Sequence, residues 1–455
     1  MRSSTDDDVL ATRAASGPVS GRGRAAGGAG GEVGLLVEHL FRRSAGRIVA
    51  TLTRALGPGR LDLAEEAVQD ALLRALQAWP HQGVPRNPEG WLFRVAHNRA
   101  LDLLRRASTA ERHAEAERDG GAGAGPNGGL ADSVVAFVDA ADPFGDDELA
   151  MVFLCCHPRI PHESRVALTL KTVGGLSVDE IAAAFLAEKA AIAQRLVRAK
   201  RVLREGDVTF ELPPASELPA RLDAVLQVLY LLFNEGYAAH SGEALVRREL
   251  CGEAIRLAEL LAAHETTSRP EVHALLALML LQASRLPARE APDGTLLLLE
   301  QQDRTLWDRS AIAAGMRHLD RAAGGDTLTV YHVGAGIASC HALAPRYEDT
   351  DWRQVLDLYD VLEALNPTPV VRLNRAVAVA MVHGPARGLE ELYRLEGEPA
   401  LRNYCLFPAT IADLLLRTGE RQEAALHYRR ALGLARTPPE RLFLEQRLRE
   451  CRTAD

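Results

Sequence analysis

The sequence is short of lysine, of cysteine pairs and of long apolar runs, and each shortage excludes something. Lysine occurs only at positions 171, 189 and 200, so arginine carries almost all of the positive charge. No run of 18 or more apolar residues is present, which argues against a membrane-spanning helix. Only 5% of the residues are aromatic, but an apolar fraction of 47% over 455 residues suffices for the cores of two or three domains.

The six cysteines are scattered and do not form the spaced pairs that a zinc site needs. Cys155 and Cys156 are adjacent, in the run CCHP, and adjacent cysteines do not easily face one ion. We therefore expect buried thiols on a helix there, with no metal site and no cofactor. Sequence motifs for nucleotide binding or hydrolysis are missing, and His97 and His157 have no candidate nucleophile partner, so we do not expect an enzyme.

The N-terminal stretch carries acidic residues early and lacks an apolar core, which argues against a secretory signal. Residues 1–31 are rich in glycine and poor in apolar side chains, so we expect a disordered arm. With neither a signal nor a membrane span, the expected location is the cytoplasm, and no membrane partner is expected.

Charge is distributed unevenly along this acidic chain, whose net charge is −8. Residues 32–107 hold 11 basic and 8 acidic residues, and residues 162–204 hold 8 basic and 4 acidic residues. Residues 211–455, in contrast, hold 27 basic and 34 acidic residues. Two basic blocks therefore precede an acidic half, an asymmetry that favours contact with nucleic acid or between the parts of the chain.

Breaks in composition divide the chain into segments. A glycine-rich stretch, Glu117–Ser133, has little to pack, and a proline-rich one, Glu211–Pro219, ends the second basic block. The remaining segments are rich in Ala, Leu, Arg and Glu with little strand-like alternation, so we predict an all-α protein. The expected parts are a disordered arm (1–31), a first helical domain (32–107), a flexible linker (108–145), a second helical domain (146–205) and a helical C-terminal domain (211–455).

The second basic block has the pattern of two helices joined by a tight turn. Gly174 and Gly175 interrupt the preceding helix, and Ser177 with Glu180 forms a capping box that starts the next one. A short turn at Leu186–Lys189 leads into the second helix. The expected apolar positions are Val178, Ile181, Ala182 and Phe185 in the first helix and Ile192, Leu196, Val197 and Leu203 in the second. This arrangement is a helix-turn-helix.

The second of these helices has an unusual charge pattern. The stretch Ile192–Arg204 carries five basic residues and no acidic one, whereas a solvated helix face normally mixes signs. Gln and Arg pair well with base edges in the major groove, and Arg and Lys neutralise phosphates. The candidate DNA-binding residues are Lys189, Gln194, Arg195, Arg198, Lys200 and Arg201.

The first basic block contains an amphipathic helix, Leu63–Pro80, followed by a helix that starts at a proline-rich turn. Acidic and amide residues share the polar side of the first helix, at Glu65, Glu66, Gln69 and Asp70. The second helix interleaves aromatic rings with arginines, which suits single-stranded DNA because bases stack on rings while cations meet phosphates. For Trp91 a place in the core is the better interpretation; for Phe93, Arg94 and Asn98 the core and a DNA surface remain equally open.

Both blocks, in this order, resemble bacterial RNA polymerase sigma factors of the extracytoplasmic-function type. Residues 36–106 resemble sigma region 2 through AEEAVQDALLRALQAWP and GWLFRVAHNRALDLLRR, and residues 146–204 resemble region 4 through FLCCHP, ESRVALTLKTVGGLS, EIAAAFL and AQRLVRAKR. The remainder is similar to the tetratricopeptide-like C-terminal extension of one sigma subgroup, through LYLLFNEGY, LLEQQDRTLWDRSAI and ADLLLRTGERQEAALHYRRAL.

The resemblance implies a function without catalytic residues: the protein would bind core RNA polymerase and direct it to promoters. Region 2 would dock on the β′ clamp helices through Glu65, Glu66, Gln69 and Asp70, and region 4 would lie near the β flap. Region 2 would read the −10 element through Phe93, Arg94, Asn98, Arg105 and Arg106, with the loop Gln82–Pro88 shaping a base pocket. Region 4 would read the −35 element through Gln194, Arg195 and Arg198, with Lys200 and Arg201 toward phosphates.

One departure from the family pattern concerns the start of the recognition helix. Ala190 and Ala191 stand where Ser or Thr is common, so the helix lacks a hydroxyl cap worth about 1 kcal/mol and a phosphate contact.

The acidic C-terminal half is expected to be regulatory, because helical repeats present concave binding surfaces. We expect it to pack on the basic domains through its opposite charge, and a small regulatory protein is a further possible partner. Tyr230, Phe233, Asn234 and Tyr237 share one helix face, which we expect to be a packing seam.

An alternative also explains the helix-turn-helix and the repeats. A transcriptional regulator with a helical-repeat sensor would act without replacing sigma, but this interpretation leaves the first basic block unexplained.

Overall fold

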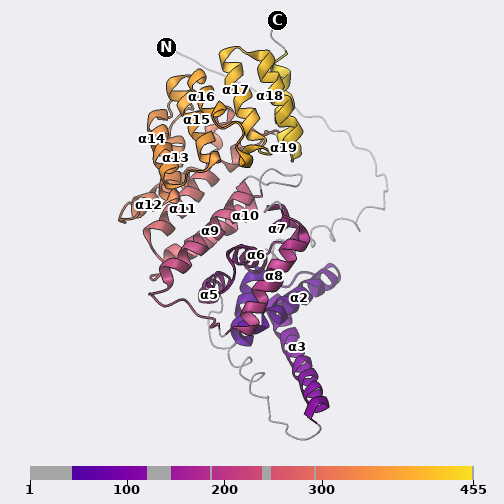
Figure 1. The fold of residues 1–455 in the computed structure, drawn as a ribbon. Coiled ribbons are helices and arrows are strands. Elements are labelled where there is room, and N and C mark those ends of the chain that lie inside the picture. The colour runs from indigo at the N-terminus through magenta and orange to yellow at the C-terminus, as the bar shows by residue number, and fades with distance from the viewer. Residues whose placement is uncertain are drawn as a thin grey trace, which may run out of the picture.

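The computed structural model describes residues 44–119, 145–184, 187–206, 208–237, 247–291 and 294–452. All regular elements in these ranges are helices, and a single bridge between Glu290 and Leu296 is their one pairing of the strand type. The prediction of an all-α protein is therefore confirmed (Figure 1). The expected disordered arm and most of the expected linker lie outside the described residues.

The first group of helices begins with a helix over 44–56 and continues through a 3-10 turn, η1 (Pro58–Arg60), into α2 (Leu61–Gln82) and α3 (Pro88–Asp119). α2 buries Ala and Leu at helical spacing against α3. Gly83 at φ +81° ends α2, a backbone conformation that favours glycine. The side chain of Asn87 then accepts a 2.9 Å hydrogen bond from the backbone N–H of Gly90 and closes the first turn of α3.

α3 is longer than the sequence suggested. A flexible linker was expected from residue 108, but α3 continues to Asp119. The reason is local, because residues 108–119 contain neither glycine nor proline and are rich in Ala, Glu and Arg, which favour helix.

The second group consists of α5 (Gly145–Cys155), α6 (His162–Thr172), α7 (Val178–Ala184) and α8 (Lys189–Glu205). The expected capping box is present, because Ser177 Oγ accepts from the backbone N–H of Glu180 at 3.1 Å and Glu180 accepts from that of Ser177 at 2.8 Å. α8 begins without any side-chain cap, as the two alanines predict. Phe185 and Leu186 lie outside the described residues.

One apolar assignment in α8 is wrong. Val197 was expected on the buried side, but its exposed fraction is 66%. The buried stripe follows Ile192, Leu196, Ala199 and Leu203. Val197 is one residue past this stripe, a rotation of about 100°, which turns its side chain to solvent.

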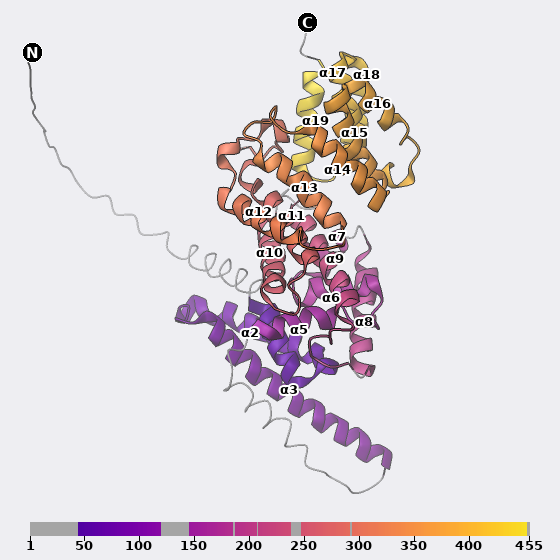
Figure 2. The same cartoon turned by 90° about the vertical axis from the view of Figure 1, so that its left-hand side faces the viewer.

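The C-terminal part is a succession of helices that pack on their neighbours in chain order. They are α9 (Leu218–Tyr237), α10 (Arg248–Ala263), α11 (Pro270–Ala283), α12 (Arg309–Ala322), α13 (Val330–Leu343), α14 (Trp352–Leu365), α15 (Pro369–His383), α16 (Pro385–Tyr393), α17 (Leu406–Thr418), α18 (Arg421–Leu434) and α19 (Pro438–Glu450). Short 3-10 turns lie between them: η2 (Leu286–Ala288), η3 (Leu299–Gln301), η4 (Arg304–Leu306) and η5 (Pro399–Leu401). The molecule is elongated, with α2 and α3 at one end and α17–α19 at the other (Figures 1 and 2).

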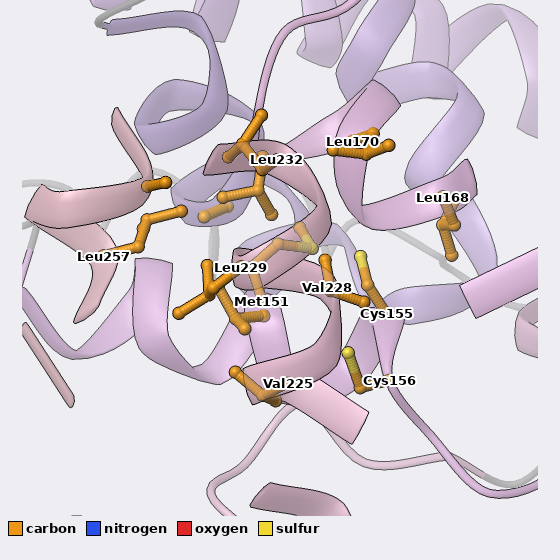
Figure 3. Packing of buried hydrophobic residues seen from close by; sticks show 14 of the residues in the cluster. Met151, Cys155, Cys156, Leu168, Leu170, Val225, Val228, Leu229, Leu232 and Leu257 are labelled. Atoms are coloured by element: carbon orange, nitrogen blue, oxygen red, sulfur yellow. The ribbon is translucent and has the colours of Figure 1, made fainter. Parts of the chain in front are cut away.

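A continuous apolar core joins the second group to the C-terminal part. α9 packs on α5 and α6, and α10 packs on α5. Figure 3 shows Cys155 and Cys156 next to Val228 of α9, and Leu229 of α9 next to Met151. Both thiols are fully buried, as predicted, and burial raises the pKa of Cys156 to about 11.

The physical basis expected for this packing was wrong. Opposite net charges were expected to hold the acidic half against the basic domains, but the contact is mainly apolar. The ion pair between Glu148 of α5 and Arg256 of α10 also crosses it with the signs reversed, since the acid belongs to the second group. Net charge describes a whole segment, whereas packing is decided by the few side chains at the contact.

The face of α9 that carries Tyr230, Phe233 and Tyr237 is a packing seam, as predicted. Phe233 is fully buried and stacks on Tyr237 with 5.7 Å between ring centroids. Tyr230 meets Tyr331 of α13 edge to face at 5.6 Å. The seam therefore ties α9 to helices much later in the chain.

Candidate nucleic-acid interface

α3 presents a polar stripe next to a partly buried aromatic pair. Arg94 and Asn98 are both exposed and stand four residues apart, so they share one face of the helix. Phe93 is half-buried and its ring stacks on that of His97, with centroids 6.2 Å apart. Trp91 packs edge to face on buried Trp79 at 5.5 Å, so its expected place in the core is confirmed.

The basic pair Arg105 and Arg106 lies further along α3 and is exposed. The guanidinium of Arg105 is 4.0 Å from the carboxylate of Asp102 on the same helix, a weak contact at an exposed site. These two arginines are separated from Arg94 and Asn98 by two turns or more, so α3 offers an elongated basic surface rather than a compact site.

The predicted polymerase-binding residues of α2 do not all face the same way. Glu66 and Asp70 both face Arg99 of α3, and the Glu66–Arg99 pair spans 3.5 Å. Gln69 is exposed. Glu65 points elsewhere: only 12% of its side chain is exposed, and it faces α8. Three of the four predicted residues therefore remain on an accessible face of α2, and Glu65 does not.

Several basic residues of α8 already have acidic partners. Lys189 pairs with Asp179 at 2.9 Å, and Arg201 pairs with Glu205 at 2.8 Å. Arg195 pairs at 2.7 Å with Glu163 of α6. The sequence argument that this face lacks acids therefore fails, because Glu205 lies on the last turn of α8 itself and folding brings Asp179 and Glu163 from neighbouring elements.

Gln194 and Arg198 are the most available of the predicted residues on α8. Both side chains are exposed. Within the described part of the chain, no acidic group lies within ion-pair distance of Arg198. The unpaired arginine and the amide stand four residues apart and share a face, a combination suited to hydrogen bonds with base edges.

Lys200 belongs to a contact between α8 and α2, which we name the α2–α8 contact and define by Asp62, Glu65, Lys200 and Arg204. Lys200 Nζ lies 2.8 Å from Asp62 and 2.6 Å from Glu65, and Arg204 lies 2.7 Å from Asp62. Only 19% of the Lys200 side chain is exposed. The predicted phosphate ligand is therefore covered by an acidic residue of the predicted polymerase-binding set.

The α2–α8 contact also shows in the pKa values of its groups. Burial alone would raise the pKa of Asp62, but Lys200 and Arg204 outweigh it and lower that pKa below its ordinary value. Burial alone would lower the pKa of Lys200, but Glu65 and Asp62 outweigh it and raise that pKa. Asp62 was not singled out from the sequence, and nothing local marks it, since its partners are distant in the chain.

Comparison with known families identifies the first helical group. The family model described as Sigma-70 region 2 matches residues 40–109, which include α2 and most of α3. The N-terminal part of the chain thus carries a sigma-70 region 2. Region 2 is the part of sigma factors that binds core RNA polymerase and promoter DNA, so the match supports a sigma-factor role in transcription initiation.

The C-terminal part of the chain matches a different model. Residues 221–323 match the description "Family of unknown function (DUF6596)", a range that runs from α9 through α12. An uncharacterized protein of Rhizobium meliloti (strain 1021) is 41% identical over 392 residues, which cover 85% of this chain and 90% of the relative. The two proteins belong to one family across nearly their whole length.

Proposed function

We propose that this protein is a sigma factor of the extracytoplasmic-function type that directs core RNA polymerase to a specific class of promoters. The observation that carries the proposal is the region 2 match over the α2–α3 pair, together with the exposed stripe on α3. Arg94, Asn98 and Phe93 would capture unpaired bases of the −10 element, and Arg105 and Arg106 would follow the backbone. Glu66, Gln69 and Asp70, with Glu65, would meet the β′ clamp helices.

We further propose that α5–α8 form region 4, with α7 and α8 as its helix-turn-helix. Gln194 and Arg198 would read bases of the −35 element, since both are exposed on one face of α8. Lys189, Arg195 and Arg201 would exchange their acidic partners for phosphates, because their ion pairs lie at or near the surface and are weak.

The α2–α8 contact gives this proposal a conformational step. Lys200 would serve as a phosphate ligand only after leaving Asp62 and Glu65, and Glu65 would meet polymerase only after losing Lys200. Polymerase and promoter would therefore bind an opened form of the protein better than the form described here. The C-terminal helices would bias this equilibrium, because α9 and α10 support α5 and α6.

Run-off transcription tests the proposed function. Purified core polymerase, a promoter library and this protein as the sole sigma should give transcripts that share one −10 and −35 pair. Arg198→Ala should lower the yield about 5-fold or more, as expected for a lost base contact of about 1–3 kcal/mol. Arg353→Ala, an exposed arginine of α14, is the matched control and should leave the yield unchanged.

Two outcomes would contradict the proposal. If neither the wild type nor Arg353→Ala gives transcripts, and the wild-type protein binds duplex DNA tightly without polymerase, then the protein acts as a separate transcriptional regulator. If Arg198→Ala and Arg353→Ala behave alike, α8 does not read the promoter.

A further inference from the structure

The C-terminal helices enclose a cavity that lies outside the proposed promoter and polymerase surfaces. Its volume is about 310 Å³. The walls come from α13, α14, α15, α17, α18 and α19, which lie together at one end of the molecule (Figure 1). Aromatic rings dominate the lining, at Tyr347, Trp352, Tyr359, Tyr428 and Phe443. Concave, mainly apolar cavities with a few polar groups are the usual form of ligand and peptide sites.

One wall of this cavity is a stretch of the chain's own backbone, residues 295–300, which we name the groove segment. Leu296 and Leu298 pack against the apolar cluster built by α15–α19. At the end of the segment, Glu300 pairs with Arg417 of α17 at 3.4 Å. The helices therefore already hold an apolar stretch that runs into the 3-10 turn η3 and ends in a carboxylate.

The fit of the groove segment is incomplete. Its leucines at 296–299 are only partly buried, and the cavity beside Leu298 and Leu299 stays open. A side chain larger than leucine at the place of Leu298 would fill part of this space and meet the aromatic lining, which favours another ring. The groove thus fits a bulkier apolar segment better than the one it contains.

The charged residues around Arg417 decide which charge a peptide bound in this cavity should carry. Arg417 lies between Glu300 and Asp413, and Asp413 also pairs with Arg447 of α19. Arg447 also pairs with Glu450 at 2.5 Å, so it keeps two acidic partners when Glu300 leaves. Arg417, in contrast, then loses one of its two. A carboxylate on the incoming segment restores the lost partner of Arg417, and a lysine there would be repelled by the guanidinium.

We infer that this groove is a docking site for an apolar peptide segment of a partner protein, which replaces the groove segment. The partner segment carries a bulky apolar side chain, preferably aromatic, at the place of Leu298 and a carboxylate at the place of Glu300. The inference is independent of promoter recognition, because it rests on the helices α13–α19 alone.

The test measures binding of a labelled peptide, GTLLFLEQ, which is residues 294–301 with Phe at the place of Leu298. The receptor is the full chain in two forms, wild type and the double variant Leu298→Ser, Glu300→Ala, whose groove segment is weakened. The double variant should bind at least about 10-fold more tightly, because the wild-type segment competes from within the same molecule at high effective concentration. Circular dichroism checks that both forms are equally helical.

Charge reversal supplies the decisive control. The peptide GTLLFLKQ should bind the double variant at least about 10-fold more weakly, and adding Arg417→Glu should reverse that preference. Absence of saturable binding to the double variant would overturn the inference, and so would equal binding of the two peptides to it. Equal affinity of wild type and double variant would exclude replacement of the groove segment and would also overturn it.

Discussion

Asp62 and Glu65 lie three residues apart on α2 and share one ammonium group, that of Lys200. Each of the two carboxylates could bind another protein only after it leaves the ammonium group of Lys200, so the free-energy cost of that separation matters. About 45% of the Asp62 side chain is exposed, and water and salt weaken its pairs with Lys200 and Arg204. At the residue scale the Asp62 side of the α2–α8 contact is therefore weak, whereas the Glu65–Lys200 pair is largely buried and costs more to separate.

The contribution of Asp62 to stability should depend on pH. Its pKa is lowered in the folded chain, so its stabilisation is present above the unfolded-state pKa and disappears as the pH falls through the folded-state pKa. At pH 7, Asp62→Asn should reduce the free energy of unfolding by no more than about 1 kcal/mol, and near pH 3 the difference should shrink. Urea unfolding at pH 7 and at pH 3 measures the stability difference between wild type and variant. Asp102→Asn, at an exposed position, is the control. A difference that grows as the pH falls would contradict the lowered pKa of Asp62.

A buried pair should behave differently from this exposed one. Glu148 is 3% exposed, and burial raises its pKa even though Arg256 pulls it down. Arg256→Ala leaves a buried carboxylate without its partner and should cost about 3–5 kcal/mol in urea unfolding at pH 7. Adding Glu148→Gln should recover part of the loss, because an uncharged amide is cheaper to bury.

The control for the Arg256 variant is an exposed pair of the same type. Arg346→Ala removes a pair with Asp349 that lies at the surface, and it should leave the free energy of unfolding almost unchanged. Equal costs for the two arginine variants would show that the Glu148–Arg256 pair is solvated rather than buried.

At the scale of single elements, local signals in the sequence proved reliable and distant ones were not visible. Neighbouring residues predict the capping box of Ser177 and Glu180, and the structure contains it. They also predict that α8 starts without a side-chain cap, and it does. The continuation of α3 beyond residue 107 was missed because a glycine-rich stretch was extended too far toward the N-terminus.

The residues of the candidate site also fall into those that local spacing predicts and those that it does not. The exposed positions of Arg94, Asn98 and Arg198 follow from helical spacing. The pairing of Lys200 with Glu65 joins residues 135 positions apart, and no periodicity predicts such a contact. Only the tertiary packing of η1 and α2 against α8 brings those charges together.

The uncapped start of α8 can be repaired. Glu188 occupies the N-cap position in an extended conformation and makes no side-chain cap bond. Glu188→Ser should supply a hydroxyl acceptor for the first free N–H groups and stabilise α8 by about 1 kcal/mol. Hydrogen exchange of the amides of Ala190 and Ala191, the second and third residues of α8, measures the local effect. Glu205→Ser at the other end of α8 is the control, and equal slowing in both variants would contradict the capping argument.

At the scale of the whole molecule, α5 and α6 are covered on two sides. The helix over 44–56 approaches the end of α6, where a Cβ on Gly46 would lie 2.7 Å from the carbonyl oxygen of Val173. α9 and α10 cover another side of α5 and α6. The C-terminal part is thus a structural wall of the proposed region 4, and any regulation it exerts acts through a shared core.

Removing the C-terminal part at Pro213 should therefore damage region 4 rather than release it. Met151, Cys155 and Cys156, all fully buried, would lose the cover of Val228 and Leu229 on α9. Burial of such side chains contributes about 1.5–3 kcal/mol each, which exceeds what a small helical domain can spare. The truncated chain should aggregate, bind a hydrophobic dye and give no run-off transcript.

In the full chain, Leu229→Ala should instead lower the melting temperature while leaving a folded protein, since it removes one buried side chain. A truncated chain that is monomeric, unfolds cooperatively and supports transcription would show that the proposed region 4 folds on its own, and the shared core would then be a regulatory interface that opens without unfolding.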